Sequence, residues 1–297
     1  MTQQRPAPET PGDETPGRPT ASPAPSGSAP AQGSEPPLPY ADRPVSSAPG
    51  HWVLARAGKR VLRPGGAALS AAMLEHAGLS GADVVELAPG LGRTAAEIIK
   101  AAPASYTAID RDPDAARRVA AVVGSRGSVR QGEAARTGLA DASADVVVGE
   151  AMLTMQGDKG KAEIVAEAVR VLRPGGRYAI HELGVVPDDI DQAYYTQLRQ
   201  DLARAIHVNA RPMTAAAWRR LLEEAGLEVD WVGTAPMALL KMSRNVRDEG
   251  LGGVLRILRN VARDRPLRQR ILGMRRTFRR YEKDMVGIVV VAHKPQV

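Results

Sequence analysis

Short apolar runs alternate along the middle of the chain with longer segments whose apolar positions have helical spacing. The runs are six to nine residues long, and several end in glycine, proline or an acidic residue, which is typical of buried parallel strands. The pattern predicts strands at 83–90, 105–110, 128–133, 144–150, 177–183, 227–234 and 286–294. It predicts helices at 67–79, 93–102, 113–123, 161–172, 191–208 and 214–226. Strands that alternate with helices of this length indicate βαβ units and a parallel sheet, that is, an α/β fold.

The first 50 residues differ from the rest of the chain in composition. They hold 13 of the 23 prolines, with small residues between them and few large apolar ones. Three arginines against five acidic residues give this segment a net charge of −2. Since the whole chain carries +7, the remaining residues carry +9. Such a segment cannot bury enough apolar surface to offset the entropy of ordering. We expect residues 1–48 to form a disordered tail and residues 49–297 to form the folded domain.

The content of cysteine and histidine limits the chemistry. The chain has no cysteine, which excludes disulfides, zinc–thiolate sites and a thiol nucleophile. Its five histidines are scattered without the spacing of metal ligands, so we expect no metal. No apolar run reaches the roughly 18 residues that a membrane span requires, and the N-terminus lacks a charged segment followed by an apolar one. We therefore expect a cytoplasmic protein.

A glycine-rich turn follows the first predicted strand. In VVELAPGLGRTA (84–95), Gly90 and Gly92 allow the backbone to approach a ligand without a Cβ clash. The next acidic residue at a strand end is Asp110, 18 residues past Gly92. A carboxylate at that position can accept hydrogen bonds from both hydroxyls of a ribose. The pattern indicates a nucleotide-type ligand.

Two nucleotide cofactors fit this turn. Residues 90–95 match the GxGxxG/A fingerprint of NAD-binding folds. Glu86, near the end of the preceding strand, suits a ligand with a cationic amino group better than a pyrophosphate. Glu133, at the end of the third strand, can accept a hydrogen bond from an adenine amino group. An NAD(P)-dependent oxidoreductase remains one alternative, although we find no Ser…Tyr-x-x-x-Lys pattern for hydride transfer. A non-catalytic binding protein that keeps the fold as a scaffold is another.

Together with AEAVRVLRPGGRYAI between the fourth and fifth strands, these motifs resemble the class I S-adenosylmethionine-dependent methyltransferases of the small-molecule type. The resemblance covers roughly residues 80–184. It implies a Rossmann-like, doubly wound, mostly parallel sheet of seven strands with an antiparallel last strand, and S-adenosyl-L-methionine as the cofactor. The folded domain then comprises an N-terminal helical segment at 49–80, a cofactor-binding core at 81–184 and a helical insertion at 241–285.

The resemblance also assigns roles to residues at the strand ends. Glu86 and the glycine turn would hold the methionine part of the cofactor, Asp110 the ribose, and Glu133 the adenine. Glu150, at the end of the fourth strand, would face the sulfonium or the substrate. Each carboxylate also has a structural alternative, such as an N-cap for Asp110. The family more often has glycine where Ala88 stands. The expected cofactor-binding residues are Glu86, Ala88, Gly90, Gly92, Asp110, Arg111, Glu133, Ala134 and Glu150.

Methyl transfer from a sulfonium is an in-line displacement in which the enzyme aligns the nucleophile with the methyl carbon and excludes water. A base is needed only where the nucleophile loses a proton. We assign this catalytic role to His181, at the carboxyl end of the fifth strand, where ligands of open α/β sheets gather. A hydrogen-bonded structural histidine is the alternative. Glu182 lies on the opposite face of a regular strand, so we do not expect the two side chains to act together.

The segment at 241–285 holds 14 lysines and arginines against 5 acidic residues, a net charge of +9. Its apolar positions have helical spacing, which predicts an amphipathic basic helix or helix pair. Three roles remain open: a cap that lines the substrate pocket with Met274 or Met285, a solvated or dimer-forming face, and a surface for RNA, an acidic partner or an anionic membrane. Only Phe278 and Tyr281 could stack on bases, which disfavours nucleic acid.

The residues after the fourth strand favour a small substrate. Many methyltransferases that act on amino groups of bases carry N/D-P-P-Y/F there, whereas this chain has the apolar sequence GEAMLTM. We therefore expect O-, C- or N-methylation of a small, largely apolar organic molecule.

The hexapeptide VLRPGG occurs twice, at 61–66 and 171–176. The second copy follows a predicted helix, and its Pro-Gly-Gly is expected to turn the chain into the fifth strand. The first copy lies before the cofactor-binding core, where Arg60 or Arg63 could meet the carboxylate of the cofactor. The flanking sequences differ, so the repeat does not indicate a duplicated domain.

Overall fold

The computed structural model describes residues 38–39, 43–60, 62–237 and 242–296, with only the backbone described at 242–248. Most of the predicted tail, residues 1–48, therefore lies outside the described residues. Its last part is folded: the amides of Ser47 and Ala48 donate to the carbonyl of Pro44, and Ala48 is fully buried. The described fold thus begins a few residues before the predicted boundary.

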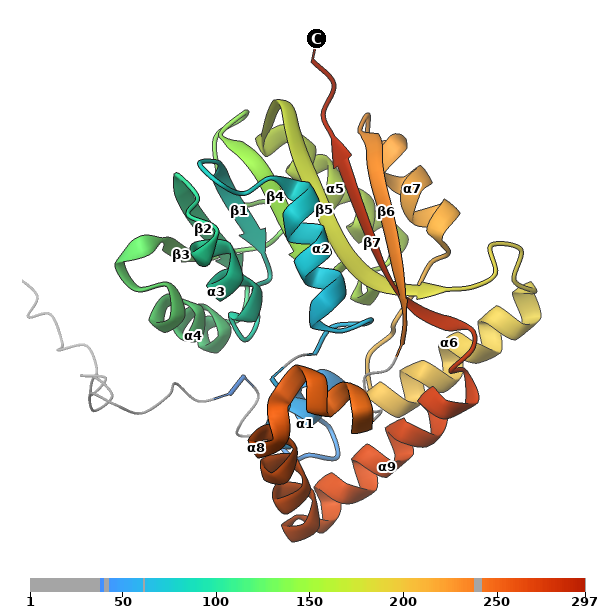
Figure 1. The fold of residues 1–297 in the computed structure, drawn as a ribbon. Helices are drawn as coiled ribbons and strands as arrows, with labels where there is room; N and C mark the ends of the chain where they lie inside the picture. Colours follow the sequence, from blue (N-terminus) through green and yellow to red (C-terminus); the bar gives the residue numbers. More distant parts are fainter. Residues whose placement is uncertain (1–37, 40–42, 61, 238–241, 297) are drawn as a thin grey trace, which may run out of the picture. The chain divides into compact units, whose positions relative to one another are not determined.

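A seven-stranded sheet forms the centre of the described fold, in the order β3-β2-β1-β4-β5-β7-β6 (Figure 1). Five strands pair in parallel, while β7 runs antiparallel to both of its neighbours, as predicted. The reversal of strand order between β1 and β4 places the carboxyl ends of these strands at a topological switch point, where ligands of such sheets bind. The strands are β1 (Asp83–Leu87), β2 (Ser105–Asp110), β3 (Ser128–Gln131), β4 (Ala144–Glu150), β5 (Leu172–Val185), β6 (Glu228–Pro236) and β7 (Met285–His293).

Helices cover both faces of the sheet (Figure 1). Successive residues of each strand face opposite sides, so Val146 and Val148 of β4 join one core cluster and Val147 joins the other. The first cluster includes α2, α3 and α4, and the second includes α5 and α7. These helices are α2 (Ala67–Ala77), α3 (Arg93–Lys100), α4 (Pro113–Val123), α5 (Asp158–Val171) and α7 (Ala215–Glu223).

Caps define where several helices begin. Thr214, the predicted N-cap of α7, accepts a hydrogen bond from the amide of Ala217. The N-cap of α4 is Asp112, whose side chain accepts from the amides of Asp114 and Ala115. The N-cap alternative for Asp110 is therefore wrong, and its side chain is available for the edge of the sheet.

In the second copy of VLRPGG, Val171 ends α5 and the other five residues already belong to β5, so they do not form a turn before the strand. Leu172 already pairs with Ala144, and the register then shifts before Arg177 pairs with Val146. The residues between them form a bulge in which Gly175 has a φ of 79°. The prediction of a helix that stops near this point is right, but the strand starts five residues earlier than expected, because the bulge keeps the chain on the sheet.

The remaining helices form a layer beside the sheet. Apolar side chains of α8 and α9 pack over α1, with Val53 and Leu54 of α1 against Leu267 and Met274 of α9. Met285 belongs to another cluster, beneath α6. Neither methionine lines the cavity described below. The insertion at 241–285 is therefore helical as predicted, but it covers α1 and does not contribute these methionines to the cavity. The helices are α1 (Gly50–Arg56), α6 (Gln192–Ile206), α8 (Met242–Arg263) and α9 (Arg265–Arg280).

Among the described residues, no helix combines the length and the apolar character needed to cross a bilayer.

Candidate active site

A cavity of about 880 Å³ opens at the carboxyl ends of β1, β2 and β4. Eight of the nine residues that we expected around the cofactor line it: Glu86, Ala88, Gly90, Asp110, Arg111, Glu133, Ala134 and Glu150. The exception is Gly92. A Cβ at that position would lie 3.2 Å from Val122 on α4, so its role is to let the loop pack on this helix. Side chains separated by 64 residues in sequence thus meet in one space.

The turn after β1 follows a backbone path that favours glycine. Gly90 and Gly92 have φ values of 56° and 74°, and Ala88 has a φ of 53° although it carries a Cβ. A Cβ at Gly90 would find no protein atom closer than 3.9 Å, so open space lies in front of this residue. The turn therefore presents its backbone to the cavity.

Glu86 is a buried carboxylate at the end of β1, only 2% exposed. The hydroxyl of Tyr106 donates a hydrogen bond of 2.5 Å to its Oε2. Burial raises the pKa of Glu86 to about 8, and this effect outweighs the hydrogen bond from Tyr106, which lowers it. A carboxylate of this kind gains most from a ligand that brings a positive charge.

Asp110 closes the edge of β2 and organises the turn beside it. Its Oδ2 accepts from the amide of Gly90 at 3.2 Å, and its Oδ1 accepts from the amide of Asp112 at 2.9 Å. Burial raises the pKa of Asp110, partly offset by these two amides. The carboxylate is thus held at the mouth of the cavity by the loops on either side of it.

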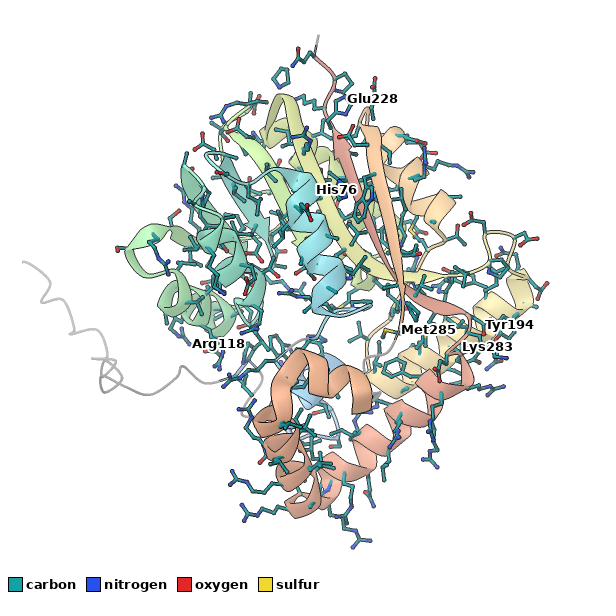
Figure 2. All side chains as sticks on the ribbon, viewed as in Figure 1. His76, Arg118, Tyr194, Glu228, Lys283 and Met285 are labelled. Carbon is teal, nitrogen blue, oxygen red and sulfur yellow. The ribbon has the colours of Figure 1, made fainter. Side chains whose placement is uncertain are left out.

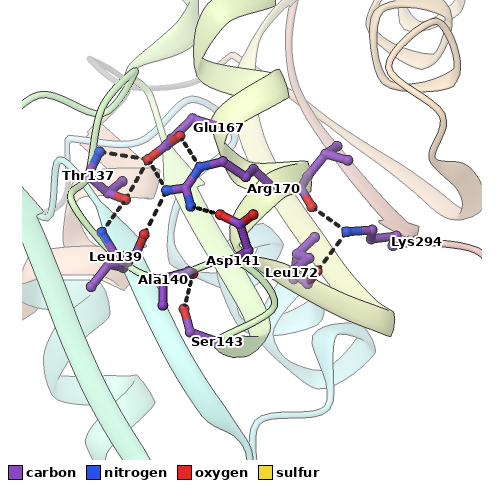
Figure 3. Close-up of polar contacts among 10 residues, drawn as sticks. Thr137, Leu139, Ala140, Asp141, Ser143, Glu167, Arg170, Leu172 and Lys294 are labelled. Carbon is purple, nitrogen blue, oxygen red and sulfur yellow. Dashed lines mark hydrogen bonds and ion pairs between the residues drawn. The ribbon is translucent and has the colours of Figure 1, made fainter.

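A polar network holds Thr137, three residues after Ala134, and is shown in Figure 3. The amide and the hydroxyl of Thr137 donate to Glu167 at 2.7 and 2.6 Å, and Arg170 donates to the same carboxylate at 2.8 Å. Hydrogen bonds from Arg170 are the largest cause that lowers the pKa of Glu167 to about 2. Glu133 itself is exposed, so the network fixes the backbone and leaves this side chain at the cavity.

Glu150 lies at the centre of a buried network. Arg63 contacts it with Nε 3.0 Å from Oε2, and Nδ1 of His181 lies 2.8 Å from Oε1, while Ser70 and Thr94 also donate to the carboxylate. Burial alone would raise the pKa of Glu150, but Arg63 and His181 lower it to about 2. Glu150 is therefore ionised and paired.

The structure corrects the position that we expected for His181. The side chain is fully buried and does not line the cavity. Its Nε2 donates to the carbonyl of Pro64, and its Nδ1 faces Glu150 and Ser70 at 2.8 and 3.0 Å. Both ring nitrogens are thus engaged with the protein, which favours the structural alternative. Glu182 faces the other way, as predicted, and accepts from the amides of residues 152–154.

The sequence did not predict that α1 lines one side of the cavity. His51 and Trp52 line the cavity, together with Met155 after β4 and Val208 after α6. Burial lowers the pKa of His51 to about 4, so its imidazole is neutral at physiological pH. Nothing in the sequence near His51 marks it, because its place depends on packing between α1 and distant elements. Arg60 and Arg63 both line the cavity as well.

In the described part of the chain, no group of three or more histidine, aspartate and glutamate side chains has the arrangement of a metal site.

The residues fit a cofactor with a cationic amino group, a ribose and a flat base. Glu86 offers a buried carboxyl group that a cationic ligand would ionise, Asp110 offers a fixed acceptor, and the turn at Gly90 has open space before its backbone. The sheet order, the antiparallel β7 and the cavity at the switch point are the architecture of the class I methyltransferases. A family model described as a methyltransferase domain matches residues 85–180, from β1 into β5.

Other proteins are similar to this chain in sequence or in fold. An uncharacterized protein of Haemophilus influenzae is 30% identical over 251 residues, which cover 82% of this chain and 98% of that protein. Phosphoethanolamine N-methyltransferase 2 of Haemonchus contortus, solved with S-adenosyl-L-methionine, has a TM-score of 0.62 at 16% identity, covering 86% of this chain and 59% of the other. The [4+2]-cyclase SpnF has a TM-score of 0.62 at 15% identity, covering 84% and 98%. The chain belongs to the class I S-adenosylmethionine-dependent methyltransferases.

Proposed function

We propose that the protein transfers the methyl group of S-adenosyl-L-methionine to a small, largely apolar organic molecule at O, C or N. One observation carries this proposal. The cavity that holds the strand-end carboxylates is also lined by His51, Trp52, Met152, Met155 and Ile164. These five side chains are mostly apolar, and they would form the part of the cavity that receives the methyl acceptor.

The strand ends would hold the cofactor. Glu86 would accept from the amino group of the methionine part, Asp110 from the ribose hydroxyls, and Glu133 with Ala134 would bound the adenine beside Arg111. When bound, the cofactor supplies an electrophilic methyl group. Arg63 is already paired with Glu150. Arg60 also lines the cavity and is exposed, so it is a better candidate than Arg63 to bind the carboxylate of the cofactor.

The apolar part of the cavity lining would bind and orient the methyl acceptor. The neutral imidazole of His51 can accept a hydrogen bond from an O–H or N–H of the acceptor, which would fix the attacking atom. Trp52 and the methionines would exclude water from the reacting atoms. His181 would act only through Glu150, as a positioning residue.

Titration calorimetry with S-adenosylhomocysteine, S-adenosylmethionine and NAD(H) tests the cofactor assignment. We expect micromolar binding of the first two and none of NAD(H). Binding of NAD(H) alone would favour an oxidoreductase and overturn the proposal.

A second experiment tests methyl transfer itself, because a protein with this fold can perform other chemistry. Purified protein is incubated with methyl-labelled S-adenosylmethionine and a set of small phenols, amines and enolisable carbonyl compounds. Formation of S-adenosylhomocysteine with a labelled product supports the proposal, and His51→Ala should raise the KM for that acceptor more than the KM for the cofactor. Tight cofactor binding without labelled product from any of these compounds would support a non-catalytic role.

A further inference from the structure

The outer side of α8 exposes leucines in a regular stripe. Leu251, Leu255 and Leu258 are 73%, 67% and 49% exposed. Steps of four and three residues place them on one face of the part of α8 that follows its internal break. Leu272 on α9 is 49% exposed. In the described ranges, these four and Tyr194 are the large hydrophobic side chains with high exposure, so four of five gather on two neighbouring helices.

Arginines surround the leucine stripe. Arg259 and Arg263 are exposed and continue the same face of α8. Between residues 249 and 280 the chain holds ten arginines against Glu249 and Asp264. Figure 2 shows long side chains with nitrogen ends that project from the outer side of α8 and α9. The exposed arginines of α9 are Arg265, Arg268, Arg276, Arg279 and Arg280.

Packing of the inner faces leaves this outer side without a partner from the described chain. Ile257 and Val261 of α8 join Leu267 and Met274 of α9 in the cluster that covers α1. The exposed leucines belong to none of the apolar clusters. They therefore do not stabilise the fold in the way that the inner residues do, and a large exposed apolar patch on a folded protein marks an interaction surface.

A groove of about 600 Å³ between α6 and α9 adds to the positive surface. It is lined by four arginines, of which Arg204 and Arg280 pair with Asp201. Arg270 is held by the protein, because its guanidinium donates to the carbonyls of Ala205 and Ala48. Arg276 is exposed, so the groove offers at least this guanidinium to a phosphate oxygen.

We propose that the outer side of α8 and α9 docks on the surface of a bilayer that contains anionic phospholipid. This inference goes beyond the proposed function and does not depend on it. Leucines on a helix face rimmed by arginines match the interfacial region of such a membrane, where acyl chains meet negative headgroups. A second copy of the chain would bring like charges together. Nucleic acid is disfavoured because Tyr281 is 1% exposed and Phe278 packs against two of the apolar clusters, so neither aromatic ring of this segment is presented for stacking.

Vesicle binding of the full chain tests the proposal. Co-sedimentation is measured with vesicles of phosphatidylcholine alone and with vesicles that contain phosphatidylglycerol. Three variants are compared: Arg259→Glu/Arg263→Glu, the leucine triple Leu251→Ser/Leu255→Ser/Leu258→Ser, and the control Arg126→Glu/Arg130→Glu. The control changes the net charge by the same amount at exposed positions near β3. All proteins are checked for unchanged thermal midpoint and unchanged affinity for S-adenosylhomocysteine.

We expect binding to the anionic vesicles only, weakened by salt. Each arginine near an anionic surface contributes about fivefold in affinity, so the double reversal on α8 should weaken binding by about 25-fold or more, and the leucine triple should weaken it as well. The control should bind within about twofold of the unchanged protein, since Arg126 and Arg130 are not on this surface. Equal binding to both vesicle types, equal loss in the control, or full binding by the leucine triple would overturn the proposal. So would dimerisation or RNA binding that the α8 variants abolish while vesicle binding is absent.

Discussion

Proton release on cofactor binding is the sharpest consequence of the buried carboxylate at the end of β1. The pKa of Glu86 lies at about 8 instead of 4.5, chiefly because the side chain is buried. Below pH 8 the ligand-free protein therefore carries a protonated Glu86. A ligand with an ammonium group favours the ionised side chain, so binding at pH 6.5 should release close to one proton and binding at pH 9 almost none from this group. Affinity should rise with pH up to about 8.

The difference in the pKa of Glu86 between the folded and unfolded states also makes the free energy of unfolding depend on pH. The folded state binds the Glu86 proton more tightly than the unfolded state, so the ligand-free protein loses stability as pH rises from 4.5 to 8. One pH unit of pKa is worth about 1.4 kcal/mol, which makes the full effect about 4 to 5 kcal/mol. Glu86→Gln keeps an acceptor for Tyr106 but cannot ionise. It should unfold in urea with less pH dependence than the unchanged protein, and should be the more stable of the two at pH 8.

Calorimetry with S-adenosylhomocysteine in buffers of different ionisation enthalpy measures the protons released. The expected result is a release near one for the unchanged protein at pH 6.5 and near zero for Glu86→Gln, which should also bind more weakly. Glu97→Gln, an exposed carboxylate on α3, is the matched control and should release as many protons as the unchanged protein. Proton release that persists in Glu86→Gln would refute the assignment of this carboxylate to the amino group.

Three further substitutions test the site. Asp110→Ala should weaken binding of S-adenosylhomocysteine by about 1.5–3 kcal/mol, the usual cost of losing hydrogen bonds to a charged group; unchanged affinity in calorimetry would mean that the ribose lies elsewhere. Ala88→Gly should stabilise the protein by about 1 kcal/mol in urea unfolding, because it relieves a φ of 53°, whereas Ala101→Gly, at a φ of −73°, should destabilise it. Arg63→Met should cost about 3–5 kcal/mol because it leaves Glu150 buried without its cation, and adding Glu150→Gln should recover part of that loss in the same assay.

Most of the sheet and most of the residues expected around the cofactor could be predicted from the sequence, because local patterns encode both. A parallel strand buried on both faces is a continuous apolar run, and the residue that follows it is placed at the sheet edge by the chain itself. That is why spacing placed Asp110 at the sheet edge, while the resemblance to the methyltransferases assigned Glu86 and Glu150 to the same site. His51 could not, since α1 reaches the cavity only by packing against α9 and the loop before α2. His181 was misplaced for the same reason: the carbonyl that accepts from its Nε2 belongs to Pro64, 117 residues away.

The two copies of VLRPGG illustrate where local encoding ends. Gly65 and Gly175 have nearly the same φ, 73° and 79°, so the hexapeptide makes the same left-handed step in both places. The two copies differ in their position in the fold, because they contact opposite ends of β7. In the first copy, a Cβ on Gly287 at the start of β7 would lie 2.5 Å from the carbonyl oxygen of Pro64. In the second, the amide of Gly175 donates at 2.7 Å to the carbonyl of Lys294, just past the other end of β7. The same hexapeptide therefore contacts both ends of the antiparallel strand β7. Its first copy also contains Arg63, which pairs with Glu150, and Pro64, whose carbonyl accepts from His181. The position of the catalytic edge of the sheet thus depends on a contact between the N-terminal segment and the last strand, which no local pattern in either segment encodes.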